Sequence, residues 1–289
     1  MSGTVAMLVM AGFGLAAGVG VTAVGPGGVL VTVGLFLASG LSPGQVAGTA
    51  IVTHLTAGGL GSLAYHRSGQ LRHAETRRVA LVLGITAAAG TPVGVYLNSV
   101  ASGQLFGILL SAFLVIVALL VWFRAVRGSA GSTGAGSTGT GSTGSSTGSS
   151  AGSAWSTGAA ELAGPGGETH PRHGLTLLTC LGLGVAIVGG MFGVGGPLLT
   201  VPLLVLAGTP VLSALGAAQV QSVVVASVGT LSYLTRGTID WRLSLVTGIP
   251  ELAGALVGWK IAHAVPSRTL RRVMIAALLI SAGLIEIHG

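Results

Sequence analysis

Long apolar runs, separated by short polar or basic connections, make up most of this sequence. A helix needs roughly 20 apolar residues to cross the hydrocarbon core of a bilayer, and these runs are of that length or longer. Because lipid offers no partners to backbone amides, such runs predict helices rather than open strands. The pattern predicts an all-α membrane protein of about eight transmembrane segments. They are expected near residues 4–38, 43–65, 79–97, 105–123, 174–206, 211–234, 243–262 and 270–287.

A segment of different composition, residues 128–173, separates the first four apolar runs from the last four. From Gly128 to Gly152 it consists almost wholly of Gly, Ser, Thr and Ala. Such a segment buries too little apolar surface to offset its chain entropy. We therefore expect a flexible linker at 128–173 between a first transmembrane repeat, 1–127, and a second, 174–289.

The two halves resemble each other when one is shifted by 168 residues, so that Gly25 meets Gly193 (193 − 25 = 168). In this register Gly27, Gly28, Leu30, Thr32 and Val33 meet Gly195, Gly196, Leu198, Thr200 and Val201. Internal duplication is common among secondary transporters. Because four segments are an even number, the second copy should enter the membrane from the same side as the first. The sequence thus predicts two parallel four-segment repeats.

Two pairs of glycines at helical spacing also recur, after a slip of four residues in the register. Gly90 and Gly94 in the first half correspond to Gly254 and Gly258 in the second. Glycines four residues apart let helix backbones approach closely. These faces are expected to pack, either between the halves or within each half.

Composition supports the membrane assignment, since 51% of the 289 residues are hydrophobic and only 7% are charged. A soluble domain carries about a quarter of its residues as charged groups. The formal net charge of +7 would suggest a nucleic-acid partner in a soluble protein. Here the basic residues lie between apolar runs, so membrane topology explains them better and no nucleic-acid partner is expected.

The basic residues also predict an orientation in the plasma membrane. With eight spans, nine Lys and Arg residues fall on one side and four on the other, which places both termini and the linker in the cytoplasm. The nine are Arg67, Arg72, Arg77, Arg78, Arg124, Arg127, Arg172, Arg236 and Arg242. The four are Lys260, Arg268, Arg271 and Arg272.

The first segment of each half is too long for one membrane helix. Residues 5–38 contain no charged residue, and one helix over them would be about 50 Å long, against a hydrocarbon core of about 30 Å. The run Gly25-Pro26-Gly27-Gly28 is expected to break it. Gly193-Val194-Gly195-Gly196-Pro197 should do the same in the second half, with Pro197 in the first turn of a new helix.

A helix that begins inside the membrane presents unpaired backbone N–H groups and the positive end of its dipole. Glycines let a ligand approach this backbone, so each break predicts a site for a small oxyanion. Alternatively, the glycines only allow close helix crossing. The candidate substrate-binding residues at the breaks are Gly25, Gly27, Gly28, Gly193, Gly195, Gly196 and Pro197.

The second half contains the runs Gly-Val-Gly-Gly-Pro-Leu-Leu-Thr-Val-Pro at 193–202 and Tyr-Leu-Thr-Arg-Gly-Thr-Ile-Asp-Trp-Arg at 233–242. Both runs resemble the TauE/SafE family of sulfite and organosulfonate exporters. The Pro-Ser-Arg-Thr-Leu-Arg run at 266–271 is also similar to that family, whereas the first copy departs from it, with Gly34 where Pro202 stands in the second. The resemblance implies export of small sulfur-containing or carboxylate anions.

Polar residues inside apolar runs are costly in lipid and suggest function. Glu251 lies near the middle of the seventh segment, where an acid suits proton coupling or a structural hydrogen bond. His54 in the second segment is a candidate gate or proton carrier, or else a packed histidine. Gln219 and Gln221 either line a polar cavity or tie helices together.

Together these features predict a secondary transporter of small anions that works by alternating access, one half rocking against the other. A membrane-embedded enzyme and a membrane scaffold are the alternatives, although no catalytic residues can be assigned because His54 has no identifiable nucleophile beside it. No metal or cofactor is expected, since Cys180 is the lone cysteine. The expected partners are the lipid bilayer, a small anion and, as a candidate, protons; the oligomeric state is not determined by the sequence.

Overall fold

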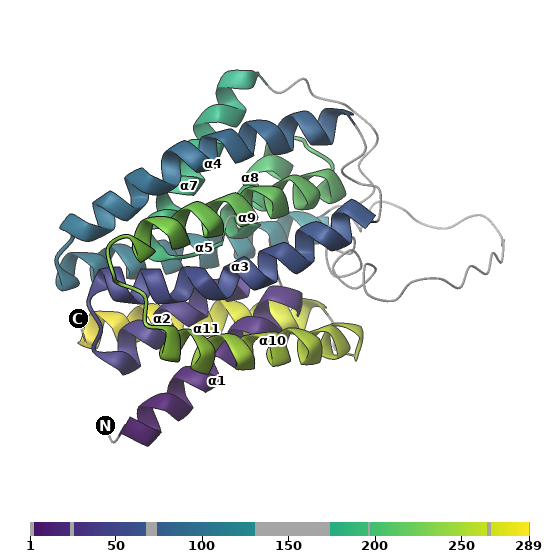
Figure 1. The fold of residues 1–289 in the computed structure, drawn as a ribbon. Helices are drawn as coiled ribbons and strands as arrows, with labels where there is room; N and C mark the ends of the chain where they lie inside the picture. The colour runs from purple at the N-terminus through teal and green to yellow at the C-terminus, as the bar shows by residue number, and fades with distance from the viewer. Residues whose placement is uncertain are drawn as a thin grey trace.

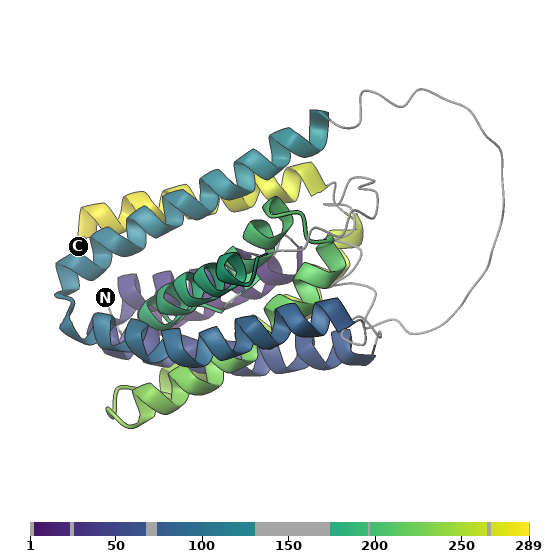
Figure 2. The same ribbon diagram turned by 90° about the horizontal axis from the view of Figure 1, so that it is seen from above.

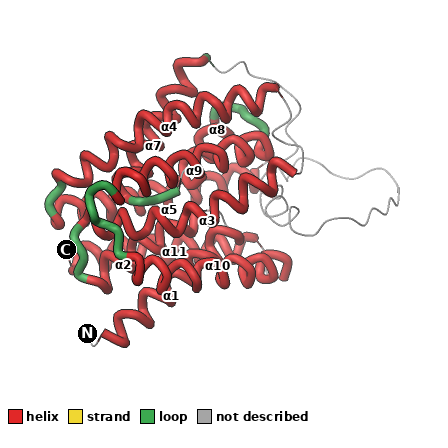
Figure 3. Tube along the Cα trace, in the orientation of Figure 1, coloured by secondary structure: helices red, strands yellow, loops and turns green. Residues whose placement is uncertain are grey.

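The computed structural model describes residues 3–23, 26–67, 74–130, 174–195, 197–264 and 267–288. Over these ranges the chain forms ten α-helices and one short 3-10 turn, without a strand (Figures 1 and 3). The all-α prediction is confirmed for this part of the chain. Most of the predicted linker, 131–173, lies outside the described residues, and helix α5 extends to Ala130, past the expected boundary at 127.

The helices follow one another in similar order in the two halves of the chain. The first half contains α1 (Gly3–Ala23), the 3-10 turn η1 (Pro26–Gly28), α2 (Val29–Ser39), α3 (Pro43–Arg67), α4 (Ala74–Val100) and α5 (Gly103–Ala130). The second contains α7 (Leu175–Phe192), α8 (Pro197–Leu206), α9 (Val211–Leu234), α10 (Trp241–Ala264) and α11 (Ser267–His288).

Among the described residues, five helices are apolar and long enough to cross a membrane: α1, α4, α5, α7 and α9. Helices α2 and α8 are apolar but have only 11 and 10 residues. A helix of 11 residues is about 16 Å long, which is short of the hydrocarbon thickness of about 30 Å. The expected count of eight spans is therefore supported in part, by five helices.

Helix starts follow local sequence signals. Ser42 and Gln45 form a capping box at the start of α3, in which the Ser42 N–H donates to Gln45 Oε1 at 3.1 Å and the Gln45 N–H donates to Ser42 Oγ at 3.4 Å. Asp240 caps α10 by accepting a hydrogen bond from the Leu243 N–H at 3.0 Å. These caps fix where α3 and α10 enter the bundle, and hence the height of the residues midway along them.

Helix α2 turns back along α1 instead of continuing in its direction. A Cβ added at Gly34 of α2 would lie 2.5 Å from Cβ of Phe13 in α1, and one at Gly20 of α1 would lie 2.8 Å from Cα of Gly27. In one straight helix, residues 13 and 34 would be about 31 Å apart. The sequence correctly predicted two helical portions on either side of 24–28, but the short one forms a hairpin with the long one.

The second half repeats this arrangement between α7 and α8. Gly193 ends α7 with a φ of +68°, a left-handed conformation that favours glycine. The side-chain amide of Gln221 accepts a hydrogen bond from Thr200 of α8 and donates one, at 3.1 Å, to the carbonyl of Gly182 in α7. Because residues 182 and 200 would be about 27 Å apart in a continuous helix, α8 must fold back beside α7.

The glycine pairs join the two halves, which decides between the two alternatives given by the sequence. On α4, Gly90 and Gly94 lie against the carbonyl groups of Leu183 and Ile187 in α7. On α10, Gly254 lies against the carbonyl of Leu15 in α1. The earlier glycine, Gly90, meets the earlier residue, Leu183, and the later glycine, Gly94, meets the later residue, Ile187. Because the contacts follow the same order along both helices, α4 and α7 are parallel.

Helix directions show that the halves are inverted, so the predicted parallel arrangement is wrong. Helix α10 runs parallel to α1, since Gly14 and Gly18 of α1 meet Thr247 and Glu251 in the same order. Helices α3 and α10 are parallel as well, with Thr49 bonded to Ser244 and Thr53 beside Gly248.

Helix α4 runs the opposite way to α3, because Asn98 near its end donates to the Pro43 carbonyl at the start of α3. Helix α7, which is parallel to α4, is therefore antiparallel to α1. The physical reason is the hairpin, because α1 and α2 together return the chain to the side of the bundle where it entered. The three further helices of the first half, α3, α4 and α5, then cross the bundle three times. Since three is an odd number, the second half starts from the opposite side of the bundle.

The ends of the chain follow from this inversion. Helix α11 is antiparallel to α5, since Gly107 lies near Ile285 and Ser111 donates to the Ala282 carbonyl at 3.3 Å. The two pack along one edge of the bundle (Figure 2). Both termini lie at the same end of the molecule (Figure 1), whereas Ala130 at the end of α5 lies at the other. The prediction that the termini and the linker share one side is therefore wrong.

Candidate functional site

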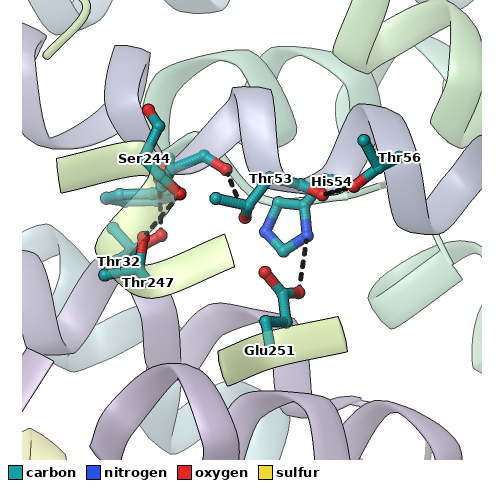
Figure 4. Close-up of polar contacts among 9 residues, drawn as sticks. Thr32, Thr53, His54, Thr56, Ser244, Thr247 and Glu251 are labelled. Atoms are coloured by element: carbon teal, nitrogen blue, oxygen red, sulfur yellow. Dashed lines mark hydrogen bonds and ion pairs between the residues drawn. The ribbon is translucent and has the colours of Figure 1, made fainter. Parts of the chain in front are cut away.

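An ionisable pair lies in the centre of the helix bundle. His54 stands midway along α3 and Glu251 midway along α10, and the His54 Nδ1 atom is 3.5 Å from Glu251 Oε1 (Figure 4). His54 is 5% exposed and Glu251 is 3% exposed. The sequence singled out both residues separately, and the structure brings them together.

Several polar atoms of this pair have no hydrogen-bond partner. They are Nε2 of His54 and both carboxylate oxygens of Glu251, since the 3.5 Å approach lacks hydrogen-bond geometry. A buried polar atom without a partner carries a desolvation penalty of about 1–3 kcal/mol. Few such atoms occur in a folded protein, and a cluster of them in one place is characteristic of a functional site.

Both helix breaks reach this pair. A Cβ added at Gly28, where α2 begins, would lie 2.6 Å from Cε1 of His54. One added at Gly195, between α7 and α8, would lie 3.8 Å from Cγ of His54 and 3.1 Å from Oγ of Ser222. The turn η1 also contacts α8. The two breaks predicted from the sequence therefore meet, with the imidazole of His54 between their glycines.

Helix α2 begins at this point without a side-chain cap. Its N-cap is Gly28, which offers no side chain to the first backbone N–H groups. The positive end of the helix dipole and these amides favour an anion. The unpartnered Nε2 of His54 adds a second potential hydrogen-bond donor or acceptor at the same place.

Other polar side chains around the pair are already hydrogen-bonded within the protein (Figure 4). Thr32 of α2 donates to the Phe192 carbonyl at 3.1 Å, which joins α2 to the end of α7. Thr53 donates to the Ala50 carbonyl at 2.9 Å, and Thr247 of α10 to the Leu243 carbonyl at 2.8 Å. These threonines hold the helices around the site, and their hydroxyl groups are already used in hydrogen bonds to backbone carbonyls.

The remaining predicted site residues are two glutamines on α9, two residues at the helix breaks, and two glycines outside the described residues. Gln221 is fully buried and ties α8 and α7 to α9 through its amide, as the helix-tying alternative expects. Gln219 is buried on the same helix. Gly27 packs against Ala17 of α1, Pro197 starts α8, and Gly25 and Gly196 lie outside the described residues.

Two residues that support the site were not singled out from the sequence for this role. Asn98 of α4 donates to the carbonyls of Pro43 and Met191, at 3.2 and 2.7 Å, and so joins the start of α3 to the end of α7. The hydroxyl of Tyr233 donates to the Gly190 carbonyl at 2.7 Å. A polar residue in an apolar run was the available signal for Asn98, but its two partners lie far away in sequence.

Within the described residues, no group of three His, Cys, Asp or Glu side chains could hold a metal ion. Cys180 lies exposed on α7. The chemistry that this part of the molecule offers is therefore one His–Glu pair and the backbone amides at the helix breaks.

Comparison with known proteins agrees with the sequence motifs. The model of the family described as sulfite exporter TauE/SafE matches residues 10–285. A protein from Sinorhizobium sp., described as probable membrane transporter protein ORF9, is 32% identical over 80 residues. The match covers 28% of this chain and 31% of that protein, so the chain spans about a third of this relative. No solved structure matches.

Proposed function

Because the chain belongs to the sulfite exporter TauE/SafE family, we propose that this membrane transporter carries small anions through the site between its two helix breaks. The observation that carries the proposal is the meeting of both breaks at a buried His–Glu pair with unpartnered polar atoms. The anions in question are sulfite, sulfonates and similar sulfur-containing or carboxylate anions. Export is the direction that the family description suggests.

In the proposed bound state, the anion accepts hydrogen bonds from the first amides of α2 and from Nε2 of His54. Gly28 matters because any side chain there would occupy space next to the His54 ring. Gly195 and Ser222 border the same place from the second half. A compact oxyanion with several acceptor atoms fits this combination of backbone and imidazole donors.

Alternating access is proposed to involve two units, each built from both halves of the chain. Helix α1 packs on α10, and α4 packs on α7, through glycines whose neighbours are backbone atoms. Helices in such close contact move together, because they have no space into which to slide. We therefore propose that the α1–α10 unit rocks against the α4–α7 unit, rather than the first half against the second. Inverted halves related by an axis in the membrane plane are common in such transporters.

A hydrolase is the rival for which the structure offers a specific test. Ser222 and His54 border Gly195, Glu251 lies beside His54, and a serine nucleophile would have to hydrogen-bond to the histidine base. Nε2 of His54 has no hydrogen-bond partner, so Ser222 is not bonded to it. The geometry therefore favours a binding role for this pair over a catalytic one.

The transport proposal is tested in proteoliposomes that contain the purified protein. Labelled sulfite or a small sulfonate is expected to exchange across the membrane, and Gly28→Leu to reduce the exchange at least tenfold, because leucine would fill the space beside His54. Gly12→Leu is the matched control, since a Cβ there meets nothing within 4 Å. Wild-type exchange in Gly28→Leu would contradict the site, and no exchange of any such anion in the wild type would contradict the function.

We also propose an orientation with both termini outside and the linker in the cytoplasm. Nine Lys and Arg residues lie in described helices at the end where α5 stops: Arg67, Arg77, Arg78, Arg124, Arg127, Lys260, Arg268, Arg271 and Arg272. Arg236 and Arg242 lie at the opposite end, and Arg72 and Arg172 lie outside the described residues. An excess of nine over two favours the first end as cytoplasmic. The inversion moves Lys260 and the Arg268–Arg272 group to the side of the other basic residues.

Cysteine labelling tests this orientation on a Cys180→Ala background. Thr235→Cys, between α9 and α10, is expected to react with a membrane-impermeant maleimide in intact cells. Glu75→Cys, at the start of α4, should react only after permeabilisation. Thr235 was expected inside by the eight-span prediction, so labelling only after permeabilisation would restore that topology and contradict the proposed one.

A further inference from the structure

We propose that the His54–Glu251 pair takes up one proton with each monovalent anion, so that the protein moves proton and anion together in the same direction. This inference rests on the proposed anion transport. It adds to that function the second transported species and the residues that carry it.

The charge of the site leads to this coupling. A His–Glu pair that shares one proton is neutral overall, whether the proton sits on the imidazole or on the carboxylate. A monovalent anion at the start of α2 would then leave one uncompensated negative charge in a buried site, beside a carboxylate with unpartnered oxygens. An uncompensated buried charge costs several kcal/mol. A second proton gives imidazolium and carboxylic acid together, and the loaded site is neutral again.

No other described side chain near the pair can compensate this charge. Helices α1, α2 and α8, which surround the breaks, contain no ionisable residue. The others on the neighbouring helices lie towards their ends: Tyr65, His66 and Arg67 on α3, Glu75, Arg77, Arg78 and Tyr96 on α4, Tyr233 on α9, and Arg242, Lys260 and His263 on α10. Cys180 of α7 is exposed. Proton uptake by His54 and Glu251 is therefore the means of neutralisation that these helices provide.

The pair occurs once, although the chain offers two equivalent positions for it. In the alignment of the halves, His54 corresponds to Ser222 and Glu251 to Ala87 (251 − 164 = 87). Both counterparts are buried, and neither can carry a proton in this way. The inverted fold thus has two similar halves but one proton site, which predicts one proton per monovalent anion.

The experiment measures both fluxes in the same proteoliposomes. With an acidic exterior and the membrane potential clamped at zero, the wild type should accumulate labelled sulfite or methanesulfonate inside. A pH-sensitive dye in the lumen should report one proton per monovalent anion. Glu251→Gln and His54→Gln should each lower the accumulation at least tenfold. Glu286→Gln removes an exposed carboxylate at the end of α11 and is the matched control, with wild-type accumulation expected.

Each outcome decides a different claim. Exchange of labelled for unlabelled anion without a pH gradient, measured in the wild type and in Glu286→Gln, reports a folded protein that binds the anion. If the wild type exchanges anion but moves no protons with it, the coupling is refuted while the transport function stands. If Glu251→Gln accumulates anion like the wild type, the assignment of the proton site is refuted. The dye measurement on the wild type decides the stoichiometry even if a variant does not fold.

Discussion

Alanine at Gly94 is expected to destabilise the native helix bundle strongly. A Cβ at this position would overlap the carbonyl of Ile187 and lie 2.8 Å from the Met191 amide nitrogen, and both obstacles are backbone of α7. Overpacking of a core typically costs about 1–3 kcal/mol when side chains can shift. Backbone cannot shift without moving the whole helix, so a loss at or above about 3 kcal/mol is expected.

Gly84→Ala on the same helix is the matched control. Its Cβ would lie 3.8 Å from a Val224 methyl group, which is an ordinary contact. Alanine is a better helix former than glycine by about 1 kcal/mol, so this control should be as stable as the wild type or more so. The measurement is the apparent Tm and the monodisperse fraction in detergent. Equal Tm values for the two variants would refute the close contact between α4 and α7.

Alanine at Gly193 is expected to reduce both stability and transport. Gly193 has a φ of +68°, and a Cβ there would overlap the carbonyl of Ala47 in α3. The left-handed conformation alone costs a non-glycine residue about 1–2 kcal/mol. The overlap adds to this cost. It also displaces the segment between α7 and α8, which places Gly195 next to His54. Anion exchange should therefore fall at least tenfold.

Gly40→Ala separates the two effects. Gly40 has a φ of +65°, but a Cβ there meets nothing within 4 Å. This variant should show the conformational cost of about 1–2 kcal/mol with normal exchange after folding. If Gly193→Ala loses no more stability than Gly40→Ala and exchanges anion normally, the shape of the second break is not required for transport.

The identity of the helix-breaking glycines could be read from the sequence, but the path of the chain after them could not. A run of 34 residues without charge (5–38) is too long for one span, so a break was predictable from length and from Gly and Pro. Whether the short portion continues forward or turns back depends on contacts such as Gly34 with Phe13. That single difference decides whether the first half crosses the bundle an even or an odd number of times. It therefore decides whether the second half is parallel to the first or inverted.

The candidate site divides in the same way. His54 and Glu251 stood out because ionisable residues are rare in apolar runs. Their pairing could not be predicted, since 197 residues separate them (251 − 54 = 197) and no local periodicity connects α3 with α10. For Gln221, the sequence left a cavity role and a tying role open, and the hydrogen bonds to Thr200 and Gly182 favour the tie.

The sequence by itself determined that this is a helical membrane protein of the TauE/SafE family with two matching helix breaks. Length, apolarity and glycine content are local properties, and a helix expresses them wherever it packs. Only the tertiary structure decided that the halves are inverted, that both breaks meet at His54, and that Glu251 faces it. These features depend on which helices lie side by side, and such packing is set by long-range contacts between small residues rather than by any one segment.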